Sequence, residues 1–515
     1  MKRLQLLLVM LLICQIAFPQ AGLLDLNFGD NGIVTTGWNN QDAVGFSIAM
    51  DPNEKIVIAG TLAKVYDGPN SIGITRYNSD GSPDISFNTN GKLKIDYSEL
   101  TNESINDMVV QPDGKIVTVG TARGIISSYD AFFLTRFNTD GSADLSFNNI
   151  GYVQTSIDGH PSRALSVLLQ QDGKILLGGG VQDDMLVYNL CLIRYNSDGS
   201  LDSTFDNDGI VVTNLSSYNF TISDLALQQD GKILAAGSCF FDFENDLAIV
   251  RYNADGSLDA AFDQDGILIT TMGQDAESTG LAILPDDKIL LAGNFYDNSN
   301  EDGLFLMKYN SDGLIDASFG NAGIAISGND FYCEAVIAQS DGRIVTCGSL
   351  GGDVALMRFN QNGAIDNSFG TVGLSLLDFY GDTDKAYDMI LQPDGKLVTA
   401  GSAYKNATSD VFSAARFLMD LGTGTASVND LDIQPVIYPN PVPAHGIFEY
   451  EISKSSNAML LLTDITGKTM RTFFSDYKNA GKHVEKLNLE GVPPGIYLLE
   501  LNANYKSVST KIIKE

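Results

Sequence analysis

The chain has 515 residues, of which 32 are Lys or Arg and 64 are Asp or Glu, so its net charge is −32. This charge argues against binding to nucleic acid or to anionic lipid, because both depend on clustered Lys and Arg side chains. The 51 Asp and 51 Gly residues far outnumber the 13 Glu residues, a balance that favours turns over helices and predicts an all-β protein.

Residues 1–21 have the order of a secretory signal peptide. Lys2 and Arg3 precede an apolar run from Leu4 to Phe18, and small residues follow it. This run is shorter than the roughly 20 residues that a membrane-spanning helix needs. We therefore expect export through the periplasm, with cleavage near Ala21.

Three phrases recur along residues 22–420. The first is a basic residue followed by an aromatic residue and a polar turn, as in Arg194-Tyr-Asn-Ser-Asp-Gly199. Its basic residues are Arg76, Arg136, Arg194, Arg251, Lys308, Arg358 and Arg416. The second phrase has a Phe three residues after an Asp and a Gly four residues after the Phe; its aspartates are Asp25, Asp84, Asp144, Asp202, Asp259, Asp316 and Asp366. The third is a tight turn such as Pro112-Asp-Gly-Lys115, a strong hairpin signal.

Each unit predicts four short antiparallel strands. In the second unit these are 107–111, 115–121, 132–138 and 151–157. Seven such units at intervals of 50 to 60 residues favour a seven-bladed β-propeller. The first unit lacks its beginning and the last lacks its fourth strand, so strand 33–36 should complete the last blade and close the ring.

The repeat resembles the delta-60 repeat of bacterial secreted proteins. The phrase from Arg194 to Phe205 carries the resemblance, which covers about residues 24–418. It implies a propeller and says little about activity.

The end of the chain has a different composition. Residues 421–434 read as a linker, and residues 435–515 alternate strands with turns in the pattern of a small β-sandwich. The acidic character belongs to the propeller, because residues 22–420 hold 21 basic and 54 acidic side chains, whereas residues 421–515 hold 9 and 10.

Four motifs in residues 435–515 resemble the type A C-terminal sorting domain of the Bacteroidetes type IX secretion system. They are Tyr438-Pro-Asn-Pro441, Asp464-Ile-Thr-Gly-Lys468, Gly491-Val-Pro-Pro-Gly-Ile-Tyr497 and Lys511-Ile-Ile-Lys514. The residues that carry the sorting signal would be Tyr438, Pro439, Asn440, Pro441, Gly467, Gly495, Tyr497, Lys511 and Lys514. The resemblance implies recognition by outer-membrane secretion machinery and release, or attachment to the cell surface.

The repeated basic and acidic residues favour a structural role over a catalytic one, because a reaction rarely needs seven copies of a site. We expect Arg194 to pair with Asp202, and their equivalents likewise, with Phe205 as a packing anchor. Cys191, Cys239, Cys333 and Cys347 read as buried thiols, with two disulfides as the alternative.

The variable segments should share the propeller face opposite the repeated turns, where a rigid scaffold can present a binding surface. Aromatic and acidic side chains gather there and suit a glycan or a protein ligand. The candidate ligand-binding residues are Trp38, Tyr66, Phe240, Asp242, Phe243, Glu244, Phe295, Tyr296, Asp297, Tyr332, Tyr380, Asp382 and Tyr404.

No catalytic motif or cofactor site is evident, and the sequence predicts no catalytic residue. Asp206-Asn-Asp-Gly209 and Asp263-Gln-Asp-Gly266 resemble parts of a calcium loop, which leaves room for weak calcium binding. We expect a secreted or surface-displayed binding module. The alternatives are an extracellular enzyme that acts on polysaccharides through carboxylates, and a structural surface protein.

Overall fold

The computed structural model describes residues 21–514 except for short segments. These segments are 39–40, 65–69, 98–99, 125–126, 216–218, 242–243, 297–301, 329, 406–408, 420–435, 439–440, 453–455, 465–468, 480 and 504–505. The expected signal peptide and linker therefore lie outside the described residues, apart from Ala21. The chain divides into two compact units, Met1–Asp420 and Leu421–Glu515.

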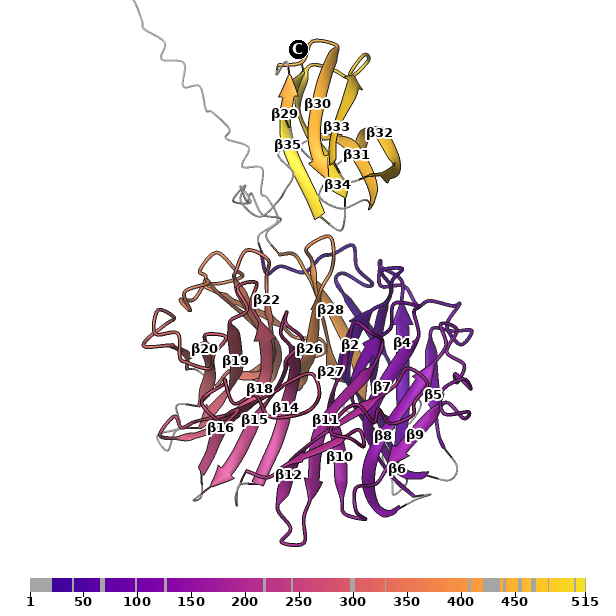
Figure 1. Ribbon diagram of the computed structural model, residues 1–515. Helices are drawn as coiled ribbons and strands as arrows, with labels where there is room; N and C mark the ends of the chain where they lie inside the picture. Colours follow the sequence, from indigo (N-terminus) through magenta and orange to yellow (C-terminus); the bar gives the residue numbers. More distant parts are fainter. Residues whose placement is uncertain are drawn as a thin grey trace, which may run out of the picture. The chain divides into compact units, whose positions relative to one another are not determined.

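The first unit contains seven four-stranded antiparallel sheets, the blades of a propeller (Figure 1). Blade 1 is β2 (Gln41–Met50), β3 (Ile56–Lys64), β4 (Ser71–Tyr77) and β5 (Lys92–Ile95); blade 2 is β6 (Leu100–Val110), β7 (Ile116–Gly124), β8 (Ser127–Phe137) and β9 (Tyr152–Thr155); blade 3 is β10 (Ser162–Leu169), β11 (Ile175–Gln182), β12 (Tyr188–Tyr195) and β13 (Ile210–Thr213). Blade 4 is β14 (Asn219–Leu227), β15 (Ile233–Phe241), β16 (Glu244–Tyr252) and β17 (Ile267–Thr270); blade 5 is β18 (Asp275–Ile283), β19 (Ile289–Tyr296), β20 (Gly303–Tyr309) and β21 (Ile324–Ser327). Blade 6 is β22 (Tyr332–Ala338), β23 (Ile344–Leu350), β24 (Asp353–Phe359) and β25 (Leu374–Leu377); blade 7 is β26 (Asp384–Leu391), β27 (Leu397–Lys405), β28 (Ser409–Phe417) and β1 (Ile33–Thr36).

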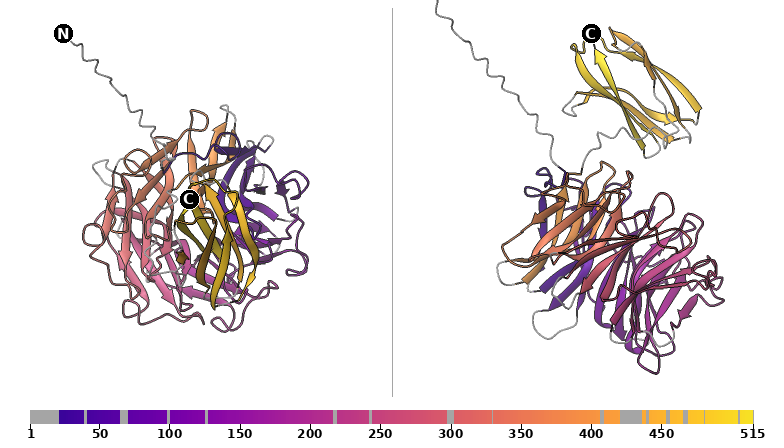
Figure 2. Two further views of the ribbon diagram at one scale, coloured as in Figure 1. Left: turned by 90° about the horizontal axis from the view of Figure 1, so that it is seen from above. Right: turned by 90° about the vertical axis from the view of Figure 1, so that its left-hand side faces the viewer.

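Strand β1 closes the ring, as the incomplete terminal units predict. It pairs antiparallel with β28, with Ile33 opposite Ala415 and Thr36 opposite Phe412. The blades therefore surround a centre with no break between the first and the last (Figure 2, left). The closed ring leaves no long free sheet edge at the junction of the two ends.

The middle strands of each blade are apolar because neighbouring blades cover both of their faces. The side chains of β4 are all buried, and so are most of those in β11 and β12. The Phe of the second repeated phrase fills the same place in every blade; Phe28, Phe87, Phe147, Phe205, Phe262, Phe319 and Phe369 have no exposed surface.

The strands of blade 2 extend beyond their predicted bounds on the side away from the repeated turns. Strand β6 begins at Leu100, whereas the sequence pattern indicated a start at Asp107. The pattern fails there because a β-bulge between Ile105 and Asp107 breaks the alternation of inward and outward side chains. Polar residues before the bulge can therefore belong to the strand.

The second unit is a two-layered β-sandwich. One sheet has the order β29 (Val436–Tyr438), β30 (His445–Ile452) and β33 (Gly481–Asn488); the other has the order β32 (Thr469–Lys478), β31 (Ser456–Asp464), β34 (Gly495–Ala503) and β35 (Lys506–Lys514). Side chains of both sheets, among them Phe448, Leu460 and Leu499, form one hydrophobic core. Within the described residues, the structure contains no helix long and apolar enough to cross a membrane.

Candidate ligand-binding site at the mouth of the central channel

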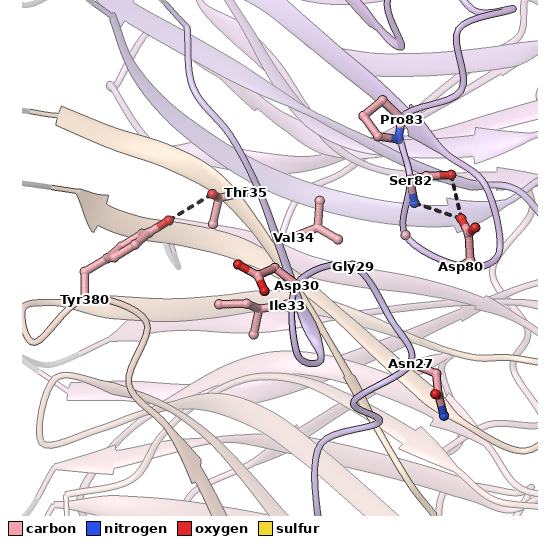
Figure 3. A pocket seen from close by; sticks show the side chains of 11 residues that line it. Asn27, Gly29, Asp30, Ile33, Val34, Thr35, Asp80, Ser82, Pro83 and Tyr380 are labelled. Atoms are coloured by element: carbon pink, nitrogen blue, oxygen red, sulfur yellow. Dashed lines mark hydrogen bonds between the residues drawn. The ribbon is translucent and has the colours of Figure 1, made fainter.

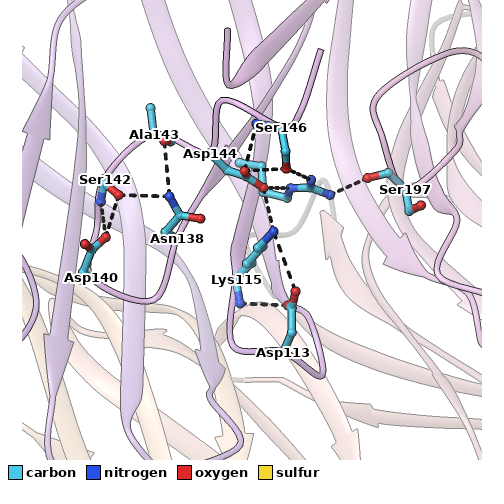
Figure 4. A network of polar contacts seen from close by, with 10 residues as sticks. Asp113, Lys115, Asn138, Asp140, Ser142, Ala143, Asp144, Ser146 and Ser197 are labelled. Carbon is cyan, nitrogen blue, oxygen red and sulfur yellow. Dashed lines mark hydrogen bonds and ion pairs between the residues drawn. The ribbon is translucent and has the colours of Figure 1, made fainter. Parts of the chain in front are cut away.

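The repeated basic and acidic residues form one network in each blade (Figure 4). In blade 2, Arg136 Nε donates to Asp144 Oδ2 at 2.7 Å, and Lys115 Nζ donates to the same oxygen at 2.9 Å. The Arg136 guanidinium also lies 4.4 Å from the centre of the Phe147 ring. Burial alone would raise the pKa of Asp144, but hydrogen bonds from Ser146, Lys115 and Arg136 hold this pKa well below its usual range.

These networks also join one blade to the next. Arg136 Nη1 donates to the backbone oxygen of Ser197, and Arg194 makes the same bond to Ala254. Arg416, whose side chain pairs with Asp25, donates to Ser79 and so links the last blade to the first. The network recurs in every blade, with Lys308 in place of the arginine in blade 5 and Arg343 in place of the lysine in blade 6, which accounts for the repetition without any catalytic role.

The structure disperses the predicted ligand-binding aromatics. Trp38 and Phe295 are only 7% and 6% exposed and pack into the cores between blades, so they are not available to a ligand. Phe240, Tyr332 and Tyr380 are 45%, 39% and 39% exposed. Glu244 and Asp382 are exposed, Tyr296 and Tyr404 are half-buried, and Tyr66, Asp242, Phe243 and Asp297 lie outside the described residues.

Tyr380 lies in a groove of 560 Å³ beside β1 (Figure 3). Its hydroxyl is 2.9 Å from the Thr35 hydroxyl, and the Lys405 ammonium lies 5.2 Å from its ring centre. The rest of the groove consists mainly of the repeated turns around Asp30 and Asp80. This groove therefore contains no further member of the predicted set.

The central channel brings together side chains of which the sequence analysis selected only Tyr332. Each first strand of a blade has a β-bulge near its middle. The skipped residues line a cavity of 240 Å³ and form a ring, here called the bulge ring: Phe46, Asn106, Leu165, Ser223, Thr279, Glu334 and Tyr387. Two residues earlier, nearer the variable face, lie Val44, Ser104, Arg163, Thr221, Glu277, Tyr332 and Lys385, here called the mouth ring.

A signal for these rings was present in the sequence. Each bulge-ring residue stands seven positions before the second residue of the repeated tight turn, as Asn106 does before Asp113 and Glu334 before Asp341. The repeated phrases stay nearly constant, whereas the residue at this offset differs in every blade. Comparison of the units at fixed offset from the turn would have identified the ring.

Three half-buried aspartates lie next to the bulge ring and tie the blades together. Asp388 Oδ2 accepts from the Ile48 amide at 2.9 Å, Asp107 Oδ2 from the Val167 amide at 2.8 Å, and Asp224 Oδ2 from the Leu281 amide at 3.1 Å. Burial, together with repulsion between these carboxyls, raises the pKa of Asp224 and of Asp388 to about 7. Burial also raises the pKa of Asp107.

The mouth of the channel carries charged and aromatic groups in defined contacts. Lys385 Nζ lies 2.5 Å from Glu334 Oε1, and burial raises the pKa of Glu334. Arg163 stacks 4.7 Å from the centre of the Tyr188 ring, and the Tyr296 hydroxyl donates to Glu277 at 3.2 Å. Such a surface can offer hydrogen bonds, an aromatic face and charge to a ligand without rearrangement of the scaffold.

The two segments that resemble parts of a calcium loop are turns with their own hydrogen bonds. Asp208 Oδ1 accepts from the Ile210 amide and Asp265 Oδ1 from the Ile267 amide, both at 2.9 Å. In the part of the chain that the structure describes, no three His, Cys, Asp or Glu side chains group to hold a metal ion. Cys191, Cys239, Cys333 and Cys347 are buried free thiols.

The predicted sorting residues are spread over the sandwich. Tyr438 is exposed and donates to Glu449, whereas Tyr497 is buried and donates to the Pro493 oxygen at 2.9 Å. Gly495, Lys511 and Lys514 belong to the paired strands β34 and β35. Pro441 precedes β30, and Pro439, Asn440 and Gly467 are not among the described residues.

The fold and its terminal sandwich define an exported seven-bladed propeller with a secretion domain, and comparison with protein families agrees. The domain of unknown function DUF5122 β-propeller matches residues 52–87, 111–147, 170–205, 228–262, 284–319, 339–369 and 392–421. The secretion system C-terminal sorting domain matches residues 436–515. The propeller is thus built of DUF5122 repeats, also called delta-60 repeats, and the sorting domain directs the protein through the type IX secretion system to the cell surface or the medium.

Solved structures match this chain at low sequence identity and with TM-scores below 0.5. PorZ, described as an essential surface component of the type IX secretion system of Porphyromonas gingivalis, matches with 11% identity and a TM-score of 0.43 over 92% of this chain. The chain spans 59% of the length of PorZ. An α-L-arabinanase of Penicillium chrysogenum (12% identity, TM-score 0.38, 61% of this chain and 92% of that one) and a PL25 ulvan lyase (10%, 0.42, 75% and 96%) also match. A search of curated proteins gives no match.

Proposed function

We propose that the exported propeller is a binding module whose ligand contacts the mouth of the central channel on the variable face. One observation carries this proposal: the repeated phrases hold seven nearly identical blades, while the bulge ring differs in every blade. A purely structural channel would need no more variety than the rest of the repeat. Seven different side chains at equivalent positions instead give a surface with one specific pattern of shape and charge.

A screen of the mature full-length chain on a glycan array, with and without calcium, tests the proposal. The variants Tyr332→Ala, in the mouth ring, and Glu334→Gln, in the bulge ring, both change the mouth of the channel. Asp140→Asn is a matched control among the exposed repeated turns. Loss of binding in both mouth variants, with binding intact in the control, supports the proposal. Equal binding by all variants contradicts it.

The enzyme alternative can be tested through one pair of carboxylates at the mouth of the channel. Glu277 and Glu334 come from neighbouring first strands, and burial raises the pKa of Glu334, as a general acid requires. Any glycan that binds should therefore be examined for shortening by the protein. Cleavage that Glu334→Gln abolishes would favour the enzyme. Self-association in the absence of any ligand would favour the structural surface protein.

A further inference from the structure

Within the proposed binding face, we infer that the seam between blades 4 and 5 is a subsite for an uncharged sugar ring, which stacks on Phe240. This inference rests on the proposed function and adds a ligand class and a location to it. A cavity of 330 Å³ lies at this seam, at the lower end of the roughly 300–1,000 Å³ typical of small-molecule sites. Such a cavity suits a short stretch of a carbohydrate chain.

Three residues form a row across blade 4 at the wall of this cavity. Phe240 on β15 lies directly opposite Asn219 on β14 and opposite Asn245 on β16. All three line the cavity, and the Phe240 side chain is 45% exposed. An exposed aromatic face is thus flanked on both sides by amide groups.

This combination matches the chemistry of a sugar ring. The C–H face of a pyranose or furanose is apolar and can cover an aromatic ring, whereas its hydroxyls at the edge need donors and acceptors. Asn219, Asn245 and Thr221 supply such groups from blade 4, and Glu277 supplies a carboxylate from blade 5. Asn245 Nδ2 already donates to Glu277 Oε1 at 3.4 Å, and an apolar ligand would leave the remaining donors and acceptors of these groups unused.

The seam is fixed before any ligand binds. The Ser278 amide donates to Ser238 Oγ at 2.9 Å, and the Asn245 amide donates to Asp275 Oδ1 at 2.7 Å, both between blades 4 and 5. The Asn219 Oδ1 atom accepts from the Tyr188 amide of blade 3 at 2.8 Å, which fixes the orientation of its side-chain amide. Because these contacts hold the row in place, little ordering entropy is lost on binding.

Charge selects against acidic glycans. No basic side chain lines the cavity, and Glu277 and the nearby Asp275 are acidic; Arg163 Nη2 reaches its border, where it donates to Thr221 Oγ1 at 3.5 Å. The propeller as a whole has 33 more acidic than basic side chains. Uronate or sulfate groups would therefore be repelled, which leaves uncharged sugars.

The experiment uses the mature full-length chain and isothermal titration calorimetry with cellohexaose, xylohexaose, mannohexaose, laminarihexaose and arabinohexaose, with hexagalacturonate as the acidic comparison. We expect at least one uncharged oligosaccharide to bind and hexagalacturonate not to bind. Phe240→Ala should weaken that binding about tenfold or more, whereas Phe240→Tyr should keep it within about threefold. Saturation-transfer NMR should show the sugar C–H protons in contact with aromatic protons, and Phe240→Ala should remove this signal.

A matched variant separates the failure of the subsite from the failure of the proposed function. Tyr332→Ala removes a similarly exposed aromatic side chain from the mouth ring in blade 6. If Phe240→Ala binds the oligosaccharide with unchanged affinity and Tyr332→Ala loses affinity, the subsite is wrong but the proposed binding face is supported. Preference for hexagalacturonate would overturn the charge argument and the inference. Failure of every oligosaccharide to bind would also overturn the inference, whereas a protein ligand sensitive to Tyr332→Ala would still support the binding face.

Discussion

Two sets of aspartates in the propeller have pKa values shifted in opposite directions. The repeated aspartates, such as Asp144, face Arg and Lys side chains and are stabilised as carboxylates. The channel aspartates Asp107, Asp224 and Asp388 accept hydrogen bonds from backbone amides; burial favours the protonated form of all three, and repulsion from Asp107 adds to this for Asp224 and Asp388. The same residue type therefore contributes to stability in opposite ranges of pH.

The substitution Asp144→Asn should destabilise the propeller by about 3 kcal/mol at pH 7, because it leaves the buried Arg136 guanidinium without its anionic partner. Asp140→Asn is the matched control, since Asp140 belongs to the same repeat but is exposed. Its effect should stay within about 1 kcal/mol. Urea unfolding followed by circular dichroism measures both. Equal shifts of the two midpoints would contradict a structural role for the buried pair.

The channel aspartates predict a stability that falls as pH rises from 5 to 8. The pKa of Asp224 and of Asp388 is about 7 in the folded protein against an ordinary value of 3.8, so the folded state binds more protons between these values. Their contribution is complete below the unfolded pKa and is lost as pH rises through the folded pKa. The pKa of the repeated aspartates is lowered, so their contribution is lost only in stronger acid.

Unfolding midpoints measured across pH 4–9 test this difference. Asp224→Ser should make the slope between pH 5 and 8 shallower, and serine is a reasonable replacement because Ser47 and Ser166 occupy the equivalent place in blades 1 and 3. Asp172→Ser, at an exposed turn, should leave the slope unchanged. A wild-type profile that is flat over this range would refute the assignment.

At the scale of elements, β1 is the part on which the ring depends. It supplies the outer strand of blade 7, and the segment before it provides Asp25, which pairs with Arg416 and Lys396. Phe28, on the same segment, is fully buried against the Arg416 side chain. The four residues of β1, the buried ion pair between Asp25 and Arg416, and the Phe28 side chain thus together hold the ring closed.

Deletion of residues 22–36 should therefore expose β28 as a free edge, lower the unfolding midpoint by about 10 °C or more, and promote association of chains. Thermal unfolding and size-exclusion chromatography measure these effects. Deletion of residues 421–515 is the control, because these residues form a separate compact unit. The first prediction is wrong if the chain without β1 remains monomeric with an unchanged midpoint.

The number of propeller strands and the ring closure could be predicted because repeated turns mark them, and the sandwich could be predicted from the alternation of strands and turns in residues 435–515. The phrase around Asp-Gly indicates hairpins, and the incomplete ends at 33–36 and 416–417 predict their own pairing. The ligand-binding residues were predicted less well from the sequence. Variability and aromatic character selected Trp38 and Phe295, but both pack between blades, since a loop aromatic can equally cover its own core.

The channel rings could not be predicted from hydrophobic alternation, because the β-bulges shift the side-chain direction in the middle of each first strand. Phe240 could be selected from its residue type, but its position between Asn219 and Asn245 depends on strand register. Long-range register is a property of the folded blade, and the spacing of residues along one chain does not reveal it.

At the scale of the whole molecule, the two units divide two tasks: the acidic propeller presents a surface, and the nearly neutral sandwich directs export. We expect the chain truncated after residue 420 to remain in the periplasm of a bacterium with a type IX secretion system, whereas the full chain reaches the surface or the medium. Fractionation and immunoblotting measure the distribution. The substitution Asp140→Asn, at an exposed turn of the propeller, leaves residues 436–515 unchanged. It serves as a control and should be exported normally.

A finer version of this prediction uses the sandwich core. Leu460 and Leu499 are fully buried between the two sheets, so Leu499→Ala should destabilise the sandwich by about 2–5 kcal/mol without any change to the propeller. If the folded sandwich is what the secretion machinery recognises, export should fall although the propeller keeps its unfolding midpoint. Export of Leu499→Ala at the normal level, with the sandwich shown to be unfolded by limited proteolysis, would mean that recognition depends on a short linear segment. Lys511 and Lys514 would then be the first residues to substitute, because both lie on β35 with side chains that are exposed or half-buried.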